Sequence, residues 1–176
     1  MGELKKVIAC MKEMGRKPKV GNFEDKLVIQ KTVCLLDLMG FGMGYCFSLY
    51  VRGPYSPNLT TDLYAHQDWV ESLKTDCVIT AKEKEMLAKI SEASDNLDPA
   101  LLEIMATYAF ISKSPGVESK EAVSRLKKLK PFYSEAKIAV GISRAKQLFP
   151  PTEKDVKEMK AEFEEFEDAA VSDNKY

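Results

Sequence analysis

The side chains that could perform covalent catalysis are few and widely separated in this sequence. His66 is the only histidine, so a nucleophile pair would have to bring Cys34 or Cys46 to it in the fold. Such a pair also needs a third group that orients the imidazole, and no spacing in the sequence supplies one. The aspartates stand singly, at no spacing typical of paired catalytic carboxylates. The sequence therefore favours a protein that is not an enzyme.

Motifs for cofactors and metals are also missing from the sequence. A single histidine cannot build a multi-histidine metal site, and no Cys-x-x-Cys pair supplies a zinc clamp. There is no Gly-x-x-x-x-Gly-Lys loop, and the glycines of residues 40–44 lack the strand and helix that flank a dinucleotide loop. We therefore expect neither a cofactor nor a bound metal.

The composition is typical of a soluble protein. Hydrophobic residues make up 45% and charged residues 30% of the 176 residues, and the net charge is −1. No apolar run approaches the roughly 18 residues of a membrane span. Three of the four cysteines (Cys10, Cys34, Cys46 and Cys77) have apolar neighbours, which favours reduced cysteines packed as small hydrophobes. We expect a cytoplasmic location and no membrane contact.

Polar and aromatic side chains gather between residues 47 and 63. Residues 47–51 alternate like a strand, and Gly53-Pro54 predicts a turn after it. Ser56 then predicts the N-cap of a helix that has Pro57 at its first position. We interpret this corner as a partner-binding surface made of Tyr50, Arg52, Gly53, Pro54, Tyr55 and Ser56. The alternative is that at least one tyrosine packs against the central helix.

The apolar spacing predicts a mainly α fold around this corner, a bundle of seven or eight helices. We expect a small two- or three-stranded β element near residues 45–51 and 77–79. The strongly apolar helix of residues 22–39 is expected to be the central core helix. Two helical lobes, 1–97 and 98–176, are expected to form one unit, and the second ends in an acidic helix.

A nucleic-acid interface is the alternative function. Residues 113–150 carry nine basic and three acidic groups, and residues 151–176 carry four and nine. Helices over 99–112, 119–129 and 134–149 would form a three-helix, winged-helix-like unit that binds nucleic acid through residues 120–147. The candidate phosphate contacts are Arg125, Lys127, Lys128, Lys130, Lys137, Arg144 and Lys146. A basic solvated face explains the same residues. If the interface is real, we expect the acidic segment to fold back on it as a counter-charge.

The residues around the corner also resemble a known family. The resemblance rests on Gln30-Lys31, Leu35-Leu36, Phe47, Tyr50, the run Gly53-Pro54-Tyr55-Ser56, Leu59 and Leu63. This pattern resembles the Panacea (SocA-type) antitoxin domain and, more closely, the related YwgA-like prokaryotic proteins. The resemblance implies a mainly helical, non-enzymatic regulatory protein of a bacterium or archaeon. Its partner would be a toxin or another regulatory protein.

Overall fold

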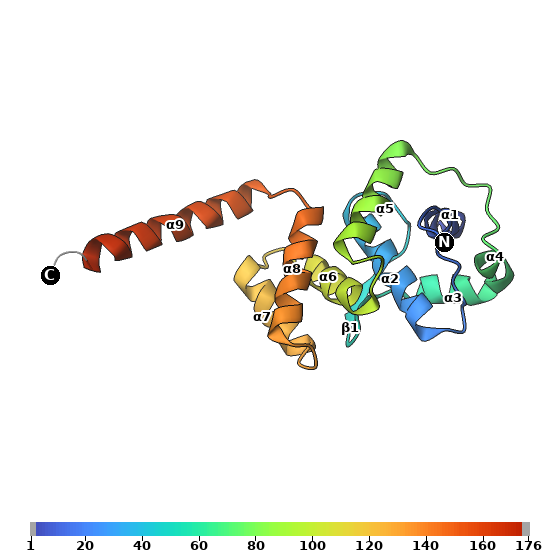
Figure 1. Cartoon of the computed structure of the whole chain (residues 1–176), viewed down its shortest axis with the longest axis horizontal. Helices are drawn as coiled ribbons and strands as arrows, with labels where there is room; N and C mark the ends of the chain where they lie inside the picture. The colour runs from blue at the N-terminus through green and yellow to red at the C-terminus, as the bar shows by residue number, and fades with distance from the viewer. Residues whose placement is uncertain (1–2, 174–176) are drawn as a thin grey trace.

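The computed structural model describes residues 3–173 and is mainly helical, with one small antiparallel sheet (Figure 1). This confirms the predicted fold class. The described residues contain nine helices, because the short segment after His66 also forms one. In chain order the elements are α1 (Leu4–Glu13), α2 (Phe23–Leu38), β1 (Ser48–Tyr50), β2 (Gly53–Tyr55), α3 (Pro57–Ala65), α4 (Gln67–Glu71), α5 (Ala81–Ala93), α6 (Pro99–Ser112), α7 (Ser119–Leu129), α8 (Glu135–Leu148) and α9 (Glu153–Asp173).

Four helices begin at a side chain that caps their first turn, and the Ser56 cap was predicted. The side chains of Asn22, Ser56, Thr80 and Asp98 each accept a hydrogen bond from the backbone N–H three residues later. Each bond satisfies an amide that the first helical turn leaves without a partner. Proline follows Ser56 and Asp98 at the first helical position, where its missing N–H costs nothing. These local signals fix where α2, α3, α5 and α6 start.

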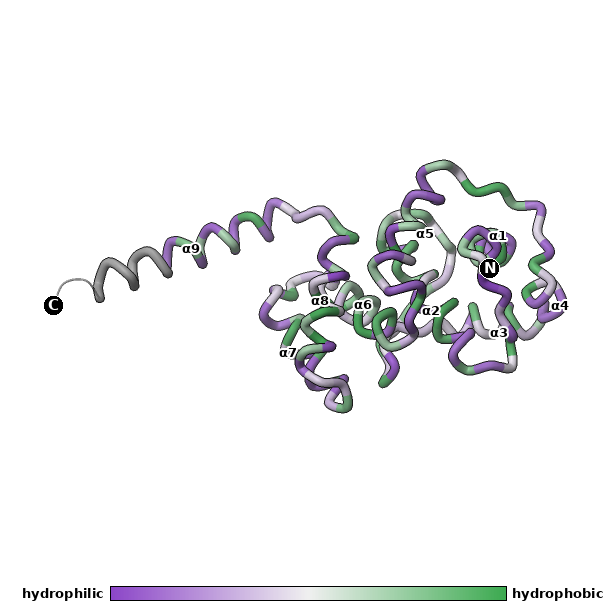
Figure 2. Tube along the Cα trace, in the orientation of Figure 1, coloured by the Kyte–Doolittle hydropathy of each residue, from purple (hydrophilic) through white to green (hydrophobic). Residues whose placement is uncertain are grey.

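Two helices share the centre of the molecule. The prediction gave this place to α2 alone, and α2 is indeed buried on all sides from Leu27 to Leu36. However, α6 is equally buried, from Leu101 to Ala109, and it packs against α2, α7, α8 and β2. Figure 2 shows apolar residues along much of this helix. A single buried core extends from Leu4 to Leu148, so it crosses the expected lobe boundary between residues 97 and 98.

The sheet differs from the one that the sequence predicts. β1 pairs with β2 rather than with residues 77–79, which form no strand. Tyr50 lies opposite Gly53, so the turn consists of Val51 and Arg52, and Gly53 belongs to the returning strand. Gly53 has a φ of 87°, which lets the chain reverse this early and which other residues rarely adopt. A two-residue loop also closes at a lower entropic cost than a pairing across about 27 residues.

The helices α6, α7 and α8 pack together without a wing. A Cβ atom at Gly141 of α8 would overlap the side chain of Ile104, which shows how closely α8 approaches α6. Within residues 3–173 the strands all precede α3, and β2 lies on α2 and α6. After α8 the chain passes through Pro150-Pro151 into α9 instead of forming a hairpin. The winged-helix-like arrangement is therefore not formed.

The acidic helix α9 does not fold back over α7 and α8. It begins at a mutual cap, in which the Asp155 carboxylate accepts from the Thr152 N–H at 2.7 Å and the Thr152 hydroxyl accepts from the Asp155 N–H at 3.2 Å. From there α9 leads away from the rest of the molecule (Figure 1). An ion pair of 3.5 Å between Lys120 and Glu162 joins it to α7. The expected folding back of the acidic segment is therefore wrong for this structure, and the Lys120–Glu162 pair is a single contact between the two segments.

Candidate functional site

Two buried lysines donate hydrogen bonds to backbone carbonyls of the β1–β2 hairpin. Lys31 of α2 donates a hydrogen bond of 2.8 Å from its Nζ atom to the Pro54 carbonyl. Lys130, which follows α7, donates to the Val51 carbonyl at 2.6 Å and forms a 2.6 Å ion pair with Glu103 of α6. The two lysines and Glu103 are almost completely buried. A buried backbone carbonyl needs a donor, and here charged side chains from distant parts of the chain supply it.

Further contacts hold the returning strand and the start of α3. The side-chain amide of Gln30 both accepts from the Ser56 N–H and donates to the Ser56 carbonyl, each at 2.9 Å. A Cβ atom at Gly53 would overlap the Thr107 hydroxyl on α6. Gly53, Pro54 and Ser56 are buried in consequence. Half of the expected binding surface is therefore structural and cannot contact a partner.

The exposed part of the hairpin lies beside two aromatic residues from elsewhere in the chain. We call the set Phe23, Tyr50, Val51, Arg52 and Phe132 the hairpin-tip patch, and each of these side chains is at least half exposed. The Arg52 guanidinium lies 5.8 Å from the centre of the Phe23 ring and 5.5 Å from that of Phe132. Both distances are within the range of a cation–π contact.

Tyr55 is the remaining residue of the expected surface. It is half-buried and stands edge-on to Tyr50, with 5.5 Å between the ring centres. Of the hairpin-tip patch, Tyr50 and Arg52 were predicted from the sequence, whereas Phe23, Val51 and Phe132 were not. Phe23 is the first residue of α2, and Phe132 lies in the loop between α7 and α8. Both phenylalanines lie outside any apolar stripe of the sequence, and this was the signal that could have identified them.

The charges around the hairpin do not balance. Arg52 approaches the second oxygen of Glu103 at 3.4 Å, so this one carboxylate faces both Arg52 and Lys130. Burial lowers the pKa of Lys31 to about 8, although Glu103 acts in the opposite direction. Burial also lowers the pKa of Lys130, and its hydrogen bond to Glu103 opposes that change. The cluster therefore has more positive than negative groups, which favours an acidic group on any partner.

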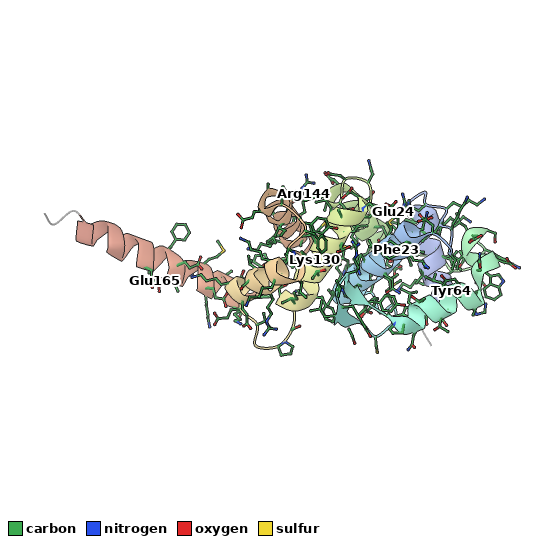
Figure 3. The ribbon with its side chains drawn as sticks, turned by 90° about the horizontal axis from the view of Figure 1, so that it is seen from below. Phe23, Glu24, Tyr64, Lys130, Arg144 and Glu165 are labelled. Carbon is green, nitrogen blue, oxygen red and sulfur yellow. The ribbon has the colours of Figure 1, made fainter. Side chains whose placement is uncertain are left out.

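The structure separates the residues expected to bind nucleic acid. Lys130 has no exposed surface and lies in the middle of the molecule, whereas Arg144 lies at an edge (Figure 3). Four of the other six are each paired with a carboxylate: Arg125 with Glu121, Lys127 with Glu135 (3.4 Å), Lys137 with Asp98 (3.9 Å) and Arg144 with Asp95 (3.7 Å). Lys128 and Lys146 form no ion pair with any side chain of residues 3–165. This distribution resembles a mixed, solvated surface more than a continuous basic one.

The groups considered for covalent chemistry are not brought together in the described chain. The His66 ring stacks on its neighbour Trp69, with 4.6 Å between the ring centres, and no hydrogen bond joins it to a cysteine there. Burial raises the pKa of Cys10 and Cys34 to about 12, which leaves both as unreactive thiols at neutral pH. All four cysteines are free, and Cys46 alone is exposed. The described residues contain no group of three side chains able to hold a metal ion.

Comparisons with known proteins do not identify a relative. No family model matches the chain, and no curated protein or solved structure matches it either. None of the described helices has the length and apolar character that crossing a membrane requires. The resemblance to antitoxin domains stays a prediction.

Proposed function

We propose that this protein is a non-enzymatic, cytoplasmic protein-interaction module that binds its partner through the hairpin-tip patch. The observation that carries the proposal is the exposed arginine held between two exposed phenylalanine rings. Aromatic residues and arginine are enriched at the centres of protein interfaces, where they supply most of the binding energy. The resemblance to antitoxin domains adds the expectation that the partner is a toxin or a regulatory protein.

The buried contacts that hold the hairpin-tip patch in place favour tight binding. Lys31, Lys130 and Glu103 fix the hairpin before a partner arrives, because their contacts join it to α2, α6 and the end of α7. A surface that is already ordered loses little conformational entropy on binding. The excess positive charge predicts an acidic side chain on the partner near Arg52, and Val51 and Phe132 predict apolar contacts around it.

The test compares two exposed valines. Val51 lies in the hairpin turn, and Val78 lies in the loop between α4 and α5 and is also highly exposed. Tagged wild-type protein, Val51→Asp and Val78→Asp would be used to purify bound proteins from lysate of the source organism. A partner retained by wild type and Val78→Asp but lost from Val51→Asp supports the proposal. Equal retention by all three proteins contradicts it, once circular dichroism shows that both variants are folded.

Nucleic-acid binding by residues 120–147 remains the second proposal. The observations in its favour are the net charge of residues 113–150 and the two lysines, Lys128 and Lys146, that form no ion pair with any side chain of residues 3–165. The carboxylates beside Arg125, Lys127, Lys137 and Arg144 count against it, since they reduce the attraction to phosphate. The burial of Lys130 removes a further contact.

A further inference from the structure

The strand β1 is the outer strand of the sheet that residues 3–173 contain. β2 packs against α2 and α6, whereas the main packing of β1 is against β2, at the edge of the molecule (Figure 1). Ser48, Leu49 and Tyr50 are all exposed. The outer side of such a strand presents backbone N–H and C=O groups to which another strand can bind.

The backbone groups of Leu49 face this outer side. Leu49 lies opposite Pro54, which has no N–H, and the Pro54 carbonyl accepts a hydrogen bond from the buried Lys31. Hydrogen-bonded and non-hydrogen-bonded pairs alternate between antiparallel strands, so the pairs before and after this one take the hydrogen-bonded places. The N–H and C=O of Leu49 therefore point away from β2.

Unbonded backbone continues along the chain before β1. Within the described residues, no hydrogen bond involves a backbone N–H or C=O of residues 44–47. Met43 and Tyr45 are buried and Phe47 is half-buried, while residues 44, 46 and 48 between them are exposed, which is the alternation of a strand. Residues 45–49 therefore combine the side-chain pattern of a strand with outward backbone groups that no described residue binds.

The charges along this edge favour an acidic partner over a second copy of this chain. Residues 38–61 contain no aspartate or glutamate, and their one charged residue is Arg52. Its only carboxylate within the described residues, Glu103, is shared with a buried lysine. A symmetric antiparallel pair of β1 strands centred on Leu49 would place Arg52 of one copy opposite Cys46 of the other, so it supplies no carboxylate. A strand of another protein can supply one.

We propose that the partner of the hairpin-tip patch adds an extended strand to the outer side of β1, with an acidic residue of that strand beside Arg52. The inference rests on the proposed function, because it states how the same partner is held. Backbone hydrogen bonds to residues 45–49 supply affinity, and contacts with Leu49 and the hairpin-tip patch select apolar and acidic side chains.

The probe is a phage-displayed library of random peptides of about ten residues, the upper length of a typical strand. Peptides selected on the wild-type protein should alternate apolar with polar residues, lack proline and carry an aspartate or glutamate. Fluorescence anisotropy with labelled synthetic copies measures their affinity. Replacing the acidic residue by its amide should weaken binding to the wild type and have little further effect on binding to Arg52→Gln. An equal loss with both proteins overturns the pairing with Arg52.

Leu49→Pro tests the backbone contact on the protein side. It removes the outward N–H but no hydrogen bond of the hairpin, and proline is tolerated on an edge strand whose N–H faces solvent. Leu49→Ala is the matched control, because it removes most of the same side chain and keeps the N–H. We expect Leu49→Pro to raise the peptide dissociation constant at least about tenfold, and Leu49→Ala to raise it much less. Equal affinity of the folded Leu49→Pro variant and the wild type overturns the proposal.

N-methylation of the peptide backbone tests the same contact without changing the protein. Every second N–H of an added strand bonds to β1, so methylation at alternate positions should weaken binding and methylation between them should not. If no alternation is found, strand addition is wrong, whereas loss of the cellular partner from Val51→Asp would still support the proposed function. A wild-type dimer that Leu49→Pro dissociates in sedimentation equilibrium also overturns the proposal, because a second copy then occupies the edge.

Discussion

Lys31 and Lys130 show how single charged residues can determine the position of a hairpin. A buried lysine usually destabilises a fold unless its ammonium group has good partners. Lys130 has a carboxylate and a carbonyl, whereas Lys31 has the Pro54 carbonyl. Burial lowers the pKa of Lys31 to about 8. Keeping Lys31 charged in the folded protein therefore lowers the free energy of unfolding, and the size of this loss depends on pH.

The stability of the protein should rise at alkaline pH because of Lys31. Its pKa is about 8 in the folded protein and near the ordinary lysine value of 10.5 when unfolded. Between these values the unfolded chain binds more protons, so the free energy of unfolding increases with pH. We expect Lys31→Met to remove a gain on the order of 1–3 kcal/mol between about pH 8 and pH 10. Urea unfolding of both proteins across this range measures it. Parallel curves for the two proteins would contradict this origin.

A side chain at Gly53 should be more harmful than one at a glycine of the same conformation. Gly40 and Gly53 both have a φ of 87°, but a Cβ atom meets nothing within 4 Å at Gly40 and overlaps Thr107 at Gly53. Gly40→Val therefore introduces backbone strain, and Gly53→Val introduces the same strain plus the overlap. We expect Gly53→Val to unfold at a lower denaturant concentration, with an additional loss of about 1–3 kcal/mol. Equal losses would show that Thr107 can move aside.

At the scale of whole elements, α7 and α8 carry many basic residues without forming a basic surface. Anisotropy titrations with mixed duplex DNA and RNA at low salt should show no strong binding, because nearby carboxylates offset Arg125, Lys127, Lys137 and Arg144. Glu121→Gln/Glu135→Gln should create a weak, salt-sensitive affinity. Tight, salt-sensitive binding by the wild type would instead support the second proposal.

The elements differ in how well the sequence predicts them. The starts of α2, α3, α5 and α6 were predictable because a cap involves residues only three positions apart. The hairpin turn was predicted at Gly53-Pro54, because this pair is typical of a turn. In the structure the turn is Val51-Arg52, and Gly53, with its left-handed backbone, follows it. Lys130 was interpreted as exposed, as lysines usually are, because its pairing with Glu103 joins residues 27 positions apart. Phe23 and Phe132 of the hairpin-tip patch were missed for the same reason, as they come from other elements.

At the scale of the whole molecule, the core and α9 should behave as separable parts. Residues 153–165 include no buried side chain, so removal of residues 153–176 takes little away from the core. We expect the truncated protein to melt within a few degrees of the wild type. A large fall in the melting temperature would show that α9 supports the core.

The contact between Lys130 and the Val51 carbonyl also has a consequence for protein synthesis. It joins residues 79 positions apart, and Phe132 of the hairpin-tip patch lies two residues further on. While a ribosome is still translating the first three quarters of the chain, the hairpin lacks Lys130 and the patch lacks one of its rings. A partner that recognised the patch would therefore require chains whose residues up to Phe132 have left the ribosome. Nascent chains that stop earlier present no complete surface to it.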